Sequence, residues 1–252
     1  MSRSVARQTH LQPMSVAVDE AIAFIRKHEP TEGYFVAFSG GKDSIVTLEL
    51  TRMSGVKHQA YYSATGIDPP EVVRFIRGHY PEVKWLRPKM SFLKAIFTKA
   101  PPLPTQRWCC DVLKKDPAAT IPIKSRLTGL RREESTKRAN RPRIDPFLER
   151  GQMLHKPIFH WKEWLVWEFI EARGLVYSSL YDEGFDRIGC VVCPFICAKN
   201  QRQVDRNKAR WPGIYRAFEH AVTRWFNAKR LGHDKDFATA KDYIAAWYKG
   251  FE

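Results

Sequence analysis

The sequence lacks the features that mark membrane, secreted and repetitive proteins. No apolar run approaches the length of a bilayer span, and residues 1–13 are polar, without the apolar stretch of a signal peptide. We find no internal repeat and no low-complexity tract. Cysteine is scarce and odd in number, with five in the chain, which argues against a disulfide framework. We therefore expect a cytoplasmic globular protein with no membrane partner.

Acidic residues are also few beside the basic ones. The chain has 27 Asp and Glu against 42 Lys and Arg, which gives a formal charge of +15 and a pI near 9.7. Such an excess attracts nucleic acids, nucleotides and other polyanions, although a basic solvated surface is the alternative. Two stretches concentrate the charge: Arg126, Arg131, Arg132, Lys137, Arg138, Arg141 and Arg143, and then Lys199, Arg202, Arg206, Lys208 and Arg210.

Strand-like and helical patterns alternate in the first half of the chain. Apolar runs at 34–38, 58–63 and 83–86 alternate with helical spacing at 16–28, 45–53, 70–76 and 92–97. This alternation predicts an α/β fold with a mostly parallel twisted sheet flanked by helices. We also expect a strand at 125–130, a helix at 162–173, a cysteine-bearing loop at 182–198 and helices from 208 onward. The expected domains are a nucleotide-binding α/β domain, 1–150, and an α-rich C-terminal part, 151–252, with a soft boundary and a loose arm at 1–13.

A glycine-rich loop follows the first predicted strand, with the sequence Ser39-Gly40-Gly41-Lys42-Asp43-Ser44. The two glycines let the backbone approach a phosphate closely, and free N–H groups at the start of the next helix attract the anion. Both serines add hydroxyl groups, Lys42 adds a cation, and Asp43 can hold Mg²⁺ against the phosphates. An ordinary turn needs none of these groups, and the spacing is not that of the GxxxxGK[ST] loop. The loop therefore predicts a site for phosphate groups and Mg²⁺.

The loop resembles the PP-loop of the ATP pyrophosphatases, or adenine nucleotide α-hydrolases, which cleave ATP between the α- and β-phosphates. Further segments resemble the phosphoadenosine phosphosulfate reductases, so that the resemblance covers most of residues 34–197 and implies a PP-loop, Rossmann-like fold. It implies that Thr65, Gly66 and Asp68 contact the nucleotide. It also implies that Arg131, Arg132 and Ser135 contact phosphate, with surface charge as the alternative for the arginines. The matching segments are Thr65-Gly66-Ile67-Asp68-Pro69-Pro70-Glu71, Gly129-Leu130-Arg131-Arg132-Glu133-Glu134-Ser135 and Ile188-Gly189-Cys190-Val191-Val192-Cys193.

The cysteines form two groups. Cys109 and Cys110, followed by Lys114, resemble the Cys-Cys-x-x-x-Lys element of reductases that carry a [4Fe–4S] cluster, and Cys190 with Cys193 would complete the ligand set. Four thiolates suit either a zinc ion or a cluster. Adjacent side chains diverge, which hinders both from reaching one ion at about 2.3 Å. We therefore favour [4Fe–4S] over zinc, and either over four inert thiols, with Lys114 offsetting the cluster's charge.

Two departures from the reductases favour ATP cleavage. The reductases lack the complete loop, and they attack their substrate with a cysteine near the C-terminus, whereas this chain has no cysteine after Cys197. We expect an ATP pyrophosphatase that adenylates a substrate for sulfur transfer, similar to the ATP-pyrophosphatase component of DNA phosphorothioate modification systems, with tRNA thiolation as a neighbouring chemistry. The expected partners are nucleic acid, a sulfur donor such as a cysteine desulfurase, and other modification subunits. The candidate catalytic residues are Lys42, Asp43, Arg131, Arg132 and Cys197.

Two other functions remain open, and so does the role of Cys197. The chain could be a sulfonucleotide reductase in which Cys197 attacks the substrate and sulfite is released. It could also be a nucleic-acid-binding subunit that uses ATP as a regulatory ligand. Cys197 itself could be an inert buried residue, a carrier of persulfide sulfur, or a cluster ligand in place of Cys109 or Cys110.

Overall fold

A computed structural model describes residues 13–228 and 237–251, so the predicted loose arm lies outside the described residues except for Pro13. No described helix is both long and apolar enough to cross a bilayer. The larger elements are α1 (Met14–Lys27), β1 (Tyr34–Phe38), α2 (Lys42–Ser54), β2 (His58–Ser63), α3 (Pro70–His79), β3 (Lys84–Leu86), α4 (Phe92–Lys99), β4 (Ser125–Leu127), β5 (Ile144–Phe147), β6 (Gln152–His155), α8 (Glu163–Ala172), α10 (Gln201–Arg210), α11 (Pro212–Ala228) and α12 (Ala240–Tyr248). The shorter helices are α5 (Trp108–Cys110), α6 (Asp116–Ala119), α7 (Thr136–Ala139) and α9 (Pro194–Cys197), with a π-helix at Asp111–Lys115 and 3₁₀ turns at Arg132–Glu134 and Leu148–Arg150.

The strands form one sheet in the order β3-β2-β1-β4-β6-β5. Phe35 of β1 is in register with Arg126 of β4, and Leu127 with His155 of β6, in parallel pairs. Only the edge strand β5 is antiparallel to its neighbour among the pairings described. The predicted fold class, a mostly parallel sheet flanked by helices with a helical C-terminal part, is confirmed.

The described residues fall into two compact units. One comprises the chain up to Ala60 together with Ile123–Tyr177, and the other comprises Tyr61–Pro122 together with the chain from Ser178 onward. Residue 150, near which we expected a soft boundary, lies in the turn between β5 and β6 of the first unit. The glycine loop belongs to the first unit and all five cysteines belong to the second.

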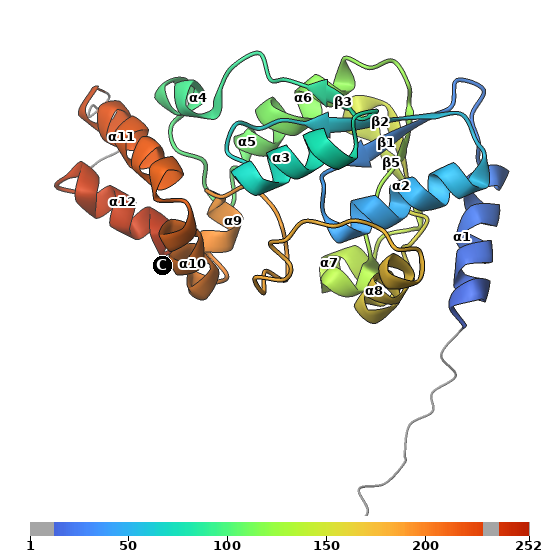
Figure 1. Cartoon of the computed structure of the whole chain (residues 1–252). Helices are drawn as coiled ribbons and strands as arrows, with labels where there is room; N and C mark the ends of the chain where they lie inside the picture. The colour runs from blue at the N-terminus through green and yellow to red at the C-terminus, as the bar shows by residue number, and fades with distance from the viewer. Residues whose placement is uncertain (1–12, 229–236, 252) are drawn as a thin grey trace, which may run out of the picture. The chain divides into compact units, whose positions relative to one another are not determined.

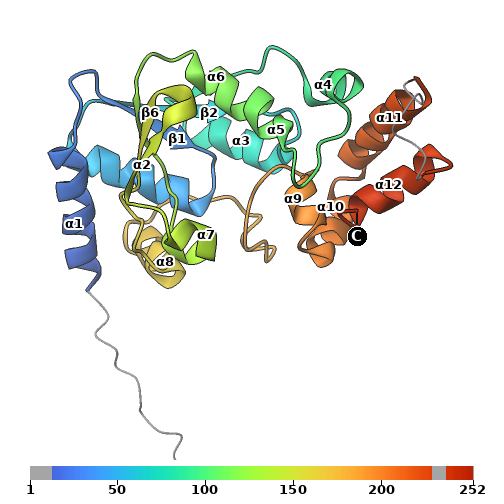
Figure 2. The ribbon, with the colours of Figure 1, turned by 180° about the vertical axis from the view of Figure 1, so that it is seen from behind.

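The first unit is built around β1. Four of its five residues are buried, as is typical of a parallel strand covered on both faces. Helix α2 packs on α1 and α8, and the three are visible together in Figure 2. Gly55 ends α2 in the left-handed conformation, at φ 73°, which a glycine adopts without strain. The start of α2 therefore has a fixed place at the end of a buried strand.

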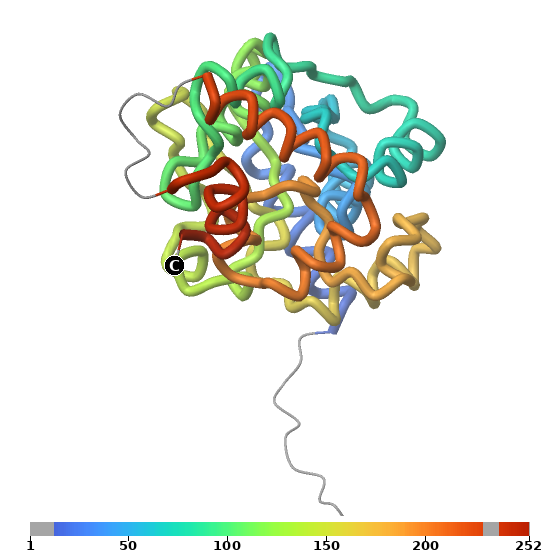
Figure 3. Tube along the Cα trace, turned by 90° about the vertical axis from the view of Figure 1, so that its left-hand side faces the viewer, coloured from blue at the N-terminus to red at the C-terminus, as the bar shows by residue number. Residues whose placement is uncertain are grey.

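The second unit has a helical core of aromatic side chains. The Phe218 ring of α11 lies 6.1 Å from that of Phe92 on α4 and 4.5 Å from that of Trp247 on α12. The Trp247 indole N–H donates to the carbonyl of Pro102 at 2.7 Å, which satisfies the polar atom of a buried ring. Helices α11 and α12 run beside each other in Figures 1 and 3. This core supports the loop that carries Cys190, Cys193 and Cys197.

Candidate functional site

The glycine loop is closed by its two serines. The Ser44 hydroxyl donates to the Gly41 carbonyl at 2.8 Å and accepts from both the N–H and the hydroxyl of Ser39, at 3.1 and 3.2 Å. Gly40 takes the left-handed conformation, at φ 73°. No side chain caps the start of α2 at Gly41, so its first N–H groups are available to an anion, as in other phosphate sites at helix N-termini.

The ammonium group of Lys42 lies inside the first unit. Its side chain is 5% exposed, and Nζ lies 3.0 Å from Oε1 of Glu163 and 3.9 Å from Oδ2 of Asp43. The same Nζ lies 6.0 Å from the centre of the Trp167 ring. Both Glu163 and Trp167 are on α8, so this helix contacts the cation that the sequence predicts to bind phosphate.

The segment that follows β4, residues 128–135, is called the return loop here, and it brings Arg131 to the start of α2. Its Nε donates to Oδ1 of Asp43 at 2.5 Å, and a second nitrogen pairs with Glu133. Burial lowers the pKa of Arg131, but the carboxylates of Asp43 and Glu133 outweigh it, so the pKa is raised and the cation is secure. Gly129 permits this approach, because a Cβ there would lie 2.6 Å from the carbonyl oxygen of Asp43. The structure thus brings Lys42, Asp43 and Arg131 together.

Arg132 and Ser135 have different surroundings. Arg132 is exposed, and within the described chain its side chain makes no ion pair. The Ser135 hydroxyl accepts from the backbone N–H of Arg138 at 3.3 Å and so caps the short helix α7. Their predicted contact with phosphate stays a prediction.

Most of the cations in the two basic stretches have carboxylate or carbonyl partners. In the first stretch Arg141 pairs with Asp145 at 3.0 Å, and Arg143 pairs with Glu20 at 2.7 Å. In the second, Lys208 pairs with Glu219 at 3.1 Å and Arg210 with Glu71 at 2.9 Å. Arg138 pairs with Glu134, and Arg206 donates to the carbonyls of Glu183 and Gly184. Of the remaining cations in these stretches, Arg126 is buried, with its guanidinium 3.9 Å from the centre of the Phe35 ring. The others are exposed and make no ion pair within the described chain: Arg132, Lys137, Lys199 and Arg202.

In the second unit a tight turn lies beside Cys190. The Asp68 carboxylate accepts a hydrogen bond from the backbone N–H of Thr65 at 2.8 Å, and the Thr65 hydroxyl accepts one from the backbone N–H of Ile67 at 3.2 Å. Gly66, at φ 78°, allows the turn. The Thr65 hydroxyl oxygen lies 3.9 Å from the sulfur of Cys190. Thr65 therefore lies against Cys190, and Asp68 holds Thr65 in place. Both residues also remain candidates for nucleotide contact.

Four thiols and a lysine interact in this unit. A hydrogen bond with Cys110 raises the pKa of Cys109, and burial and the thiols of Cys190 and Cys193 raise it further. The same hydrogen bond lowers the pKa of Cys110, with Lys114 and two other cations assisting. Cys190 raises the pKa of Lys114, so its ammonium form is stabilised beside the thiols. Lys114 is held by the π-helix that follows Cys110, a form common at functional sites.

The cysteine group is not arranged around one ion. Among the described His, Cys, Asp and Glu residues, no three side chains are placed to hold a single metal ion. Cys197 is buried, at 3% exposure, and burial raises its pKa to about 12. A sulfur carrier needs an exposed thiol of lowered pKa. This environment favours the inert interpretation of Cys197, whose role stays a prediction.

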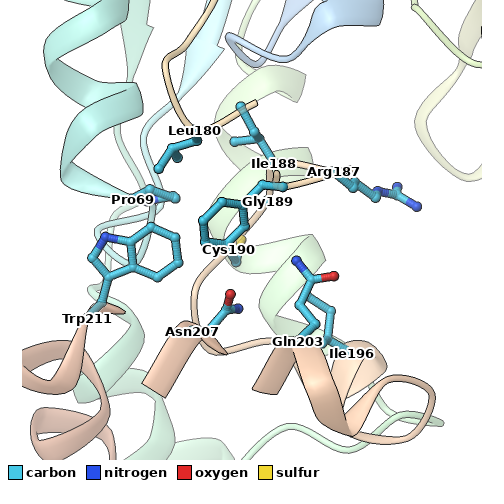
Figure 4. Close-up of a pocket in the computed structure, with 11 residues that line it drawn as sticks. Pro69, Leu180, Arg187, Ile188, Gly189, Cys190, Ile196, Gln203, Asn207 and Trp211 are labelled. Atoms are coloured by element: carbon cyan, nitrogen blue, oxygen red, sulfur yellow. The ribbon is translucent and has the colours of Figure 1, made fainter. Parts of the chain in front are cut away.

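A small cavity opens beside Cys190, lined by Pro69, Trp211 and Asn207 among others (Figure 4). The Asn207 amide donates to the carbonyl of Val191 at 3.1 Å, while its buried oxygen has no partner in the described chain. The space suits about one water molecule bound to that oxygen. The sequence carried no signal for this cavity, because its walls come from segments far apart in the chain.

Sequence reasoning also missed Glu163 and Trp167. Both lie in an aromatic helix whose pattern indicates core packing alone. Glu133 lies within the reductase-like segment from Gly129 to Ser135, but the resemblance implies phosphate contacts only for the neighbouring arginines and Ser135. A pairing of Lys42 with Glu163 depends on how α8 packs on α2, which no local pattern encodes.

Comparison with known proteins agrees with the fold. The family model of the phosphoadenosine phosphosulfate reductase domain matches residues 33–195. A phosphoadenosine 5'-phosphosulfate reductase of Gloeobacter violaceus is 29% identical over 188 residues, which cover 71% of this chain and 77% of that protein. An uncharacterised protein of Methanocaldococcus jannaschii is 30% identical over 227 residues, 84% of this chain and 46% of that protein. The chain spans about half the length of this relative and of a second one from the same organism.

Two solved structures share the fold. The phosphate complex of phosphoadenylyl-sulfate reductase from Candida auris has a TM-score of 0.54 at 18% identity, and the match covers 75% of this chain and 98% of that one. FMN adenylyltransferase from Candida glabrata, in complex with FAD and inorganic pyrophosphate, has a TM-score of 0.52 at 14% identity, covering 70% and 62%. At these identities the likeness concerns the fold alone, and it agrees with the predicted α/β fold.

Proposed function

Since the chain belongs to the phosphoadenosine phosphosulfate reductase domain family, we propose that it is the ATP-cleaving variant of that fold, which converts ATP to AMP and pyrophosphate and adenylates a substrate for sulfur transfer. The observation that carries this proposal is the complete loop from Ser39 to Ser44, with Lys42 and Arg131 converging on the start of α2. The uncapped helix start, the buried ammonium and the guanidinium suit the pyrophosphate end of ATP.

The chemistry proceeds in two displacements. A substrate oxygen attacks the α-phosphorus, the bond to the β-phosphate breaks, and pyrophosphate leaves with the electron pair. A persulfide R–S–SH, the sulfur donor, then attacks the carbon or phosphorus that bears the adenylated oxygen, and AMP leaves. A second thiol finally attacks the donor's sulfur in the resulting substrate–S–S–R, which releases the thiolated substrate and leaves the donor and that thiol joined as a disulfide. Lys42 and Arg131 would neutralise the charge that grows on the leaving pyrophosphate. Asp43, which Arg131 orients in the free protein, would hold Mg²⁺.

The cysteine group supports an iron–sulfur cluster. The thiols and the ammonium group of Lys114 influence one another's pKa, and four thiolates with diverging adjacent side chains suit the separate iron corners of a cluster. Cys109, Cys110, Cys190 and Cys193 would hold the cluster, which supplies sulfur-binding and redox chemistry when bound. Lys114 would balance its negative charge, and the Thr65 hydroxyl would lie beside the Cys190 ligand.

A nucleic-acid acceptor is supported by cations next to these cysteines. Arg107 and Lys199 lie over the exposed Phe195 ring, at 5.0 and 4.5 Å, and within the described chain neither makes an ion pair. Arg107 precedes Cys109, and Phe195 lies between Cys193 and Cys197. Two unneutralised cations held against one ring suit a phosphate backbone with unpaired bases.

Product analysis tests the proposal. The full chain, purified without oxygen, is incubated with ATP and Mg²⁺, with and without DNA or RNA, and AMP and pyrophosphate are quantified. We expect both products in equal amounts, with more product in the presence of the acceptor. Formation of ADP and phosphate, or no cleavage with any acceptor, would reject ATP pyrophosphatase activity. Binding of ATP without cleavage would support the regulatory-subunit alternative.

A second candidate is reduction of adenylylsulfate or phosphoadenylylsulfate, because relatives such as the Gloeobacter violaceus protein are named as such reductases. Cys197 would then attack the sulfur of the substrate, and a thiol reductant would release sulfite. The burial of Cys197 disfavours this attack. Sulfite release from either nucleotide in the presence of a dithiol, lost in Cys197→Ser, would establish it over ATP cleavage.

A further inference from the structure

Three carboxylates neutralise the cations of the phosphate site in the free protein. Lys42 lies 3.0 Å from Glu163, and Arg131 is bonded to Asp43 and Glu133. Asp43 is part of the loop, but Glu163 belongs to the start of α8, in a segment that the loop chemistry does not require. Its side chain is 52% exposed, whereas that of Lys42 is 5% exposed. The carboxylate is therefore the partner that can leave this ion pair into solvent, whereas the ammonium group is enclosed.

Glu133 joins this carboxylate to the return loop. Its Oε1 accepts from the backbone N–H of Glu163 at 2.5 Å, and its Oε2 lies 3.4 Å from the ammonium of Lys162. Glu133 thus takes up an N–H at the start of α8, which has no side-chain cap of its own. Since Glu133 also pairs with Arg131, one carboxylate ties the start of α8 to the guanidinium assigned to phosphate.

We infer that Glu163 is an internal competitor of the nucleotide: its carboxylate occupies the place over Lys42 in the free protein, and it must leave when a pyrophosphate group binds. The inference rests on the proposed function, because it takes Lys42 as a phosphate contact. Binding exchanges one carboxylate for phosphate oxygens at the same ammonium.

The test measures the affinity of the full chain for inorganic pyrophosphate with Mg²⁺ by calorimetry. Glu163→Gln removes the competing charge, and Glu163→Asp keeps the charge but shortens its reach to Lys42. Both should bind pyrophosphate about three- to ten-fold more tightly than the wild type, as expected from release of a half-exposed ion pair. Glu168→Gln, an exposed position on the same helix, is the matched control and should leave the affinity unchanged.

Each other outcome rejects the inference in a recognisable way. Tighter binding by Glu163→Gln alone would mean that the long-range charge, not the contact, opposes phosphate. Unchanged or weaker binding in both variants would mean that Glu163 does not compete. If the folded wild type and all variants fail to bind pyrophosphate, the role of the loop in the proposed function fails as well. If the wild type binds pyrophosphate and Glu163→Gln binds no more tightly, only the present inference fails.

Discussion

The glycine-loop region and the cysteine region satisfy their charged groups in opposite ways. In the first, the cations Lys42 and Arg131 are each paired with a carboxylate, at 3.0 and 2.5 Å. In the second, the hydrogen bond between Cys109 and Cys110 raises the pKa of one thiol and lowers that of the other, and Arg107 and Lys199 make no ion pair in the described chain. A region with paired charges is organised before its ligand arrives. A region of crowded thiols and unpaired cations is stabilised only when something binds them.

This difference has a structural origin. The loop site uses six consecutive residues at the end of a buried strand, so its backbone geometry is set locally, and one return loop completes it. The cysteine site collects the turn at Thr65, the π-helix after Cys110 and the segment from Cys190 to Cys197. We therefore expect substitutions in the loop to affect chemistry, and substitutions in the cysteine group to affect retention of a metal.

The largest expected effect is at Asp43. Asp43→Ala should lower AMP formation by about 10²-fold or more, because the carboxylate that would hold Mg²⁺ is lost. It should leave the iron content unchanged, since the cysteines lie in the other unit. Asp19→Ala, an exposed position on α1, is the control. Wild-type AMP formation in folded Asp43→Ala would remove the loop from the mechanism.

Substitution of a cluster cysteine should change the iron content of the protein, which Asp43→Ala leaves unchanged. Protein purified without oxygen should be brown and hold about four irons, and Cys109→Ser should lose them. Cys197→Ser should keep full iron and, as an inert thiol, full sulfur transfer. Elemental analysis that finds one zinc per chain would contradict the cluster. Full iron without thiolated product in Cys197→Ser would instead identify a sulfur carrier, and loss of iron would identify a ligand.

Substitutions of the two arginines of the return loop should have different effects on stability. Arg131→Ala breaks a largely buried ion pair and should lower the free energy of unfolding by about 2 kcal/mol, besides weakening ATP turnover. Arg132→Ala removes an exposed side chain and should change that free energy by less than about 0.5 kcal/mol, with an effect on ATP binding alone. Denaturant unfolding and ATP kinetics measure both quantities. Equal losses in the free energy of unfolding would contradict the different environments of the two arginines. Wild-type ATP kinetics in both variants would show that neither arginine contacts the nucleotide.

Acid should weaken the first unit through His155. This ring is buried among Phe24, His28 and Tyr34, and neither ring nitrogen has a partner in the described chain. Burial, with His28 assisting, lowers the pKa of His155 from 6.5 to about 4. Below pH 6.5 the unfolded chain takes up the proton first, so stability is lost as the pH falls from 6.5 through about 4. The expected loss between neutral pH and about pH 5 is on the order of 2 kcal/mol.

Hydrogen exchange at the two pH values locates this effect. In the wild type, protection should fall in the first unit, and His155→Phe should remove most of that change. The exposed His220→Gln in the second unit should behave as the wild type. An equal pH dependence in His155→Phe would show that another group governs acid lability.

The sequence by itself determined the mostly parallel sheet and the place of the glycine-rich loop in it. The strand at Tyr34–Phe38 begins and ends where its apolar run predicts, and Gly40 and Gly41 stand where the backbone must turn into α2. The helices α1, α3, α4 and α8 also follow their apolar spacing. These features depend on neighbouring residues, so local composition and periodicity are sufficient to predict them.

The tertiary structure alone decided the partners of the charged groups. The β5–β6 hairpin was not predicted, because its strands are four residues each and β5 contains Pro146, so pairing with β4 rather than local propensity forms them. The basic stretches predicted polyanion contact, yet Arg131, Arg143 and Arg210 meet carboxylates from distant segments. Glu163 reaches Lys42 only because α8 packs on α2. Ion pairing acts over a few ångströms in space whatever the separation in sequence, and only the fold sets those distances.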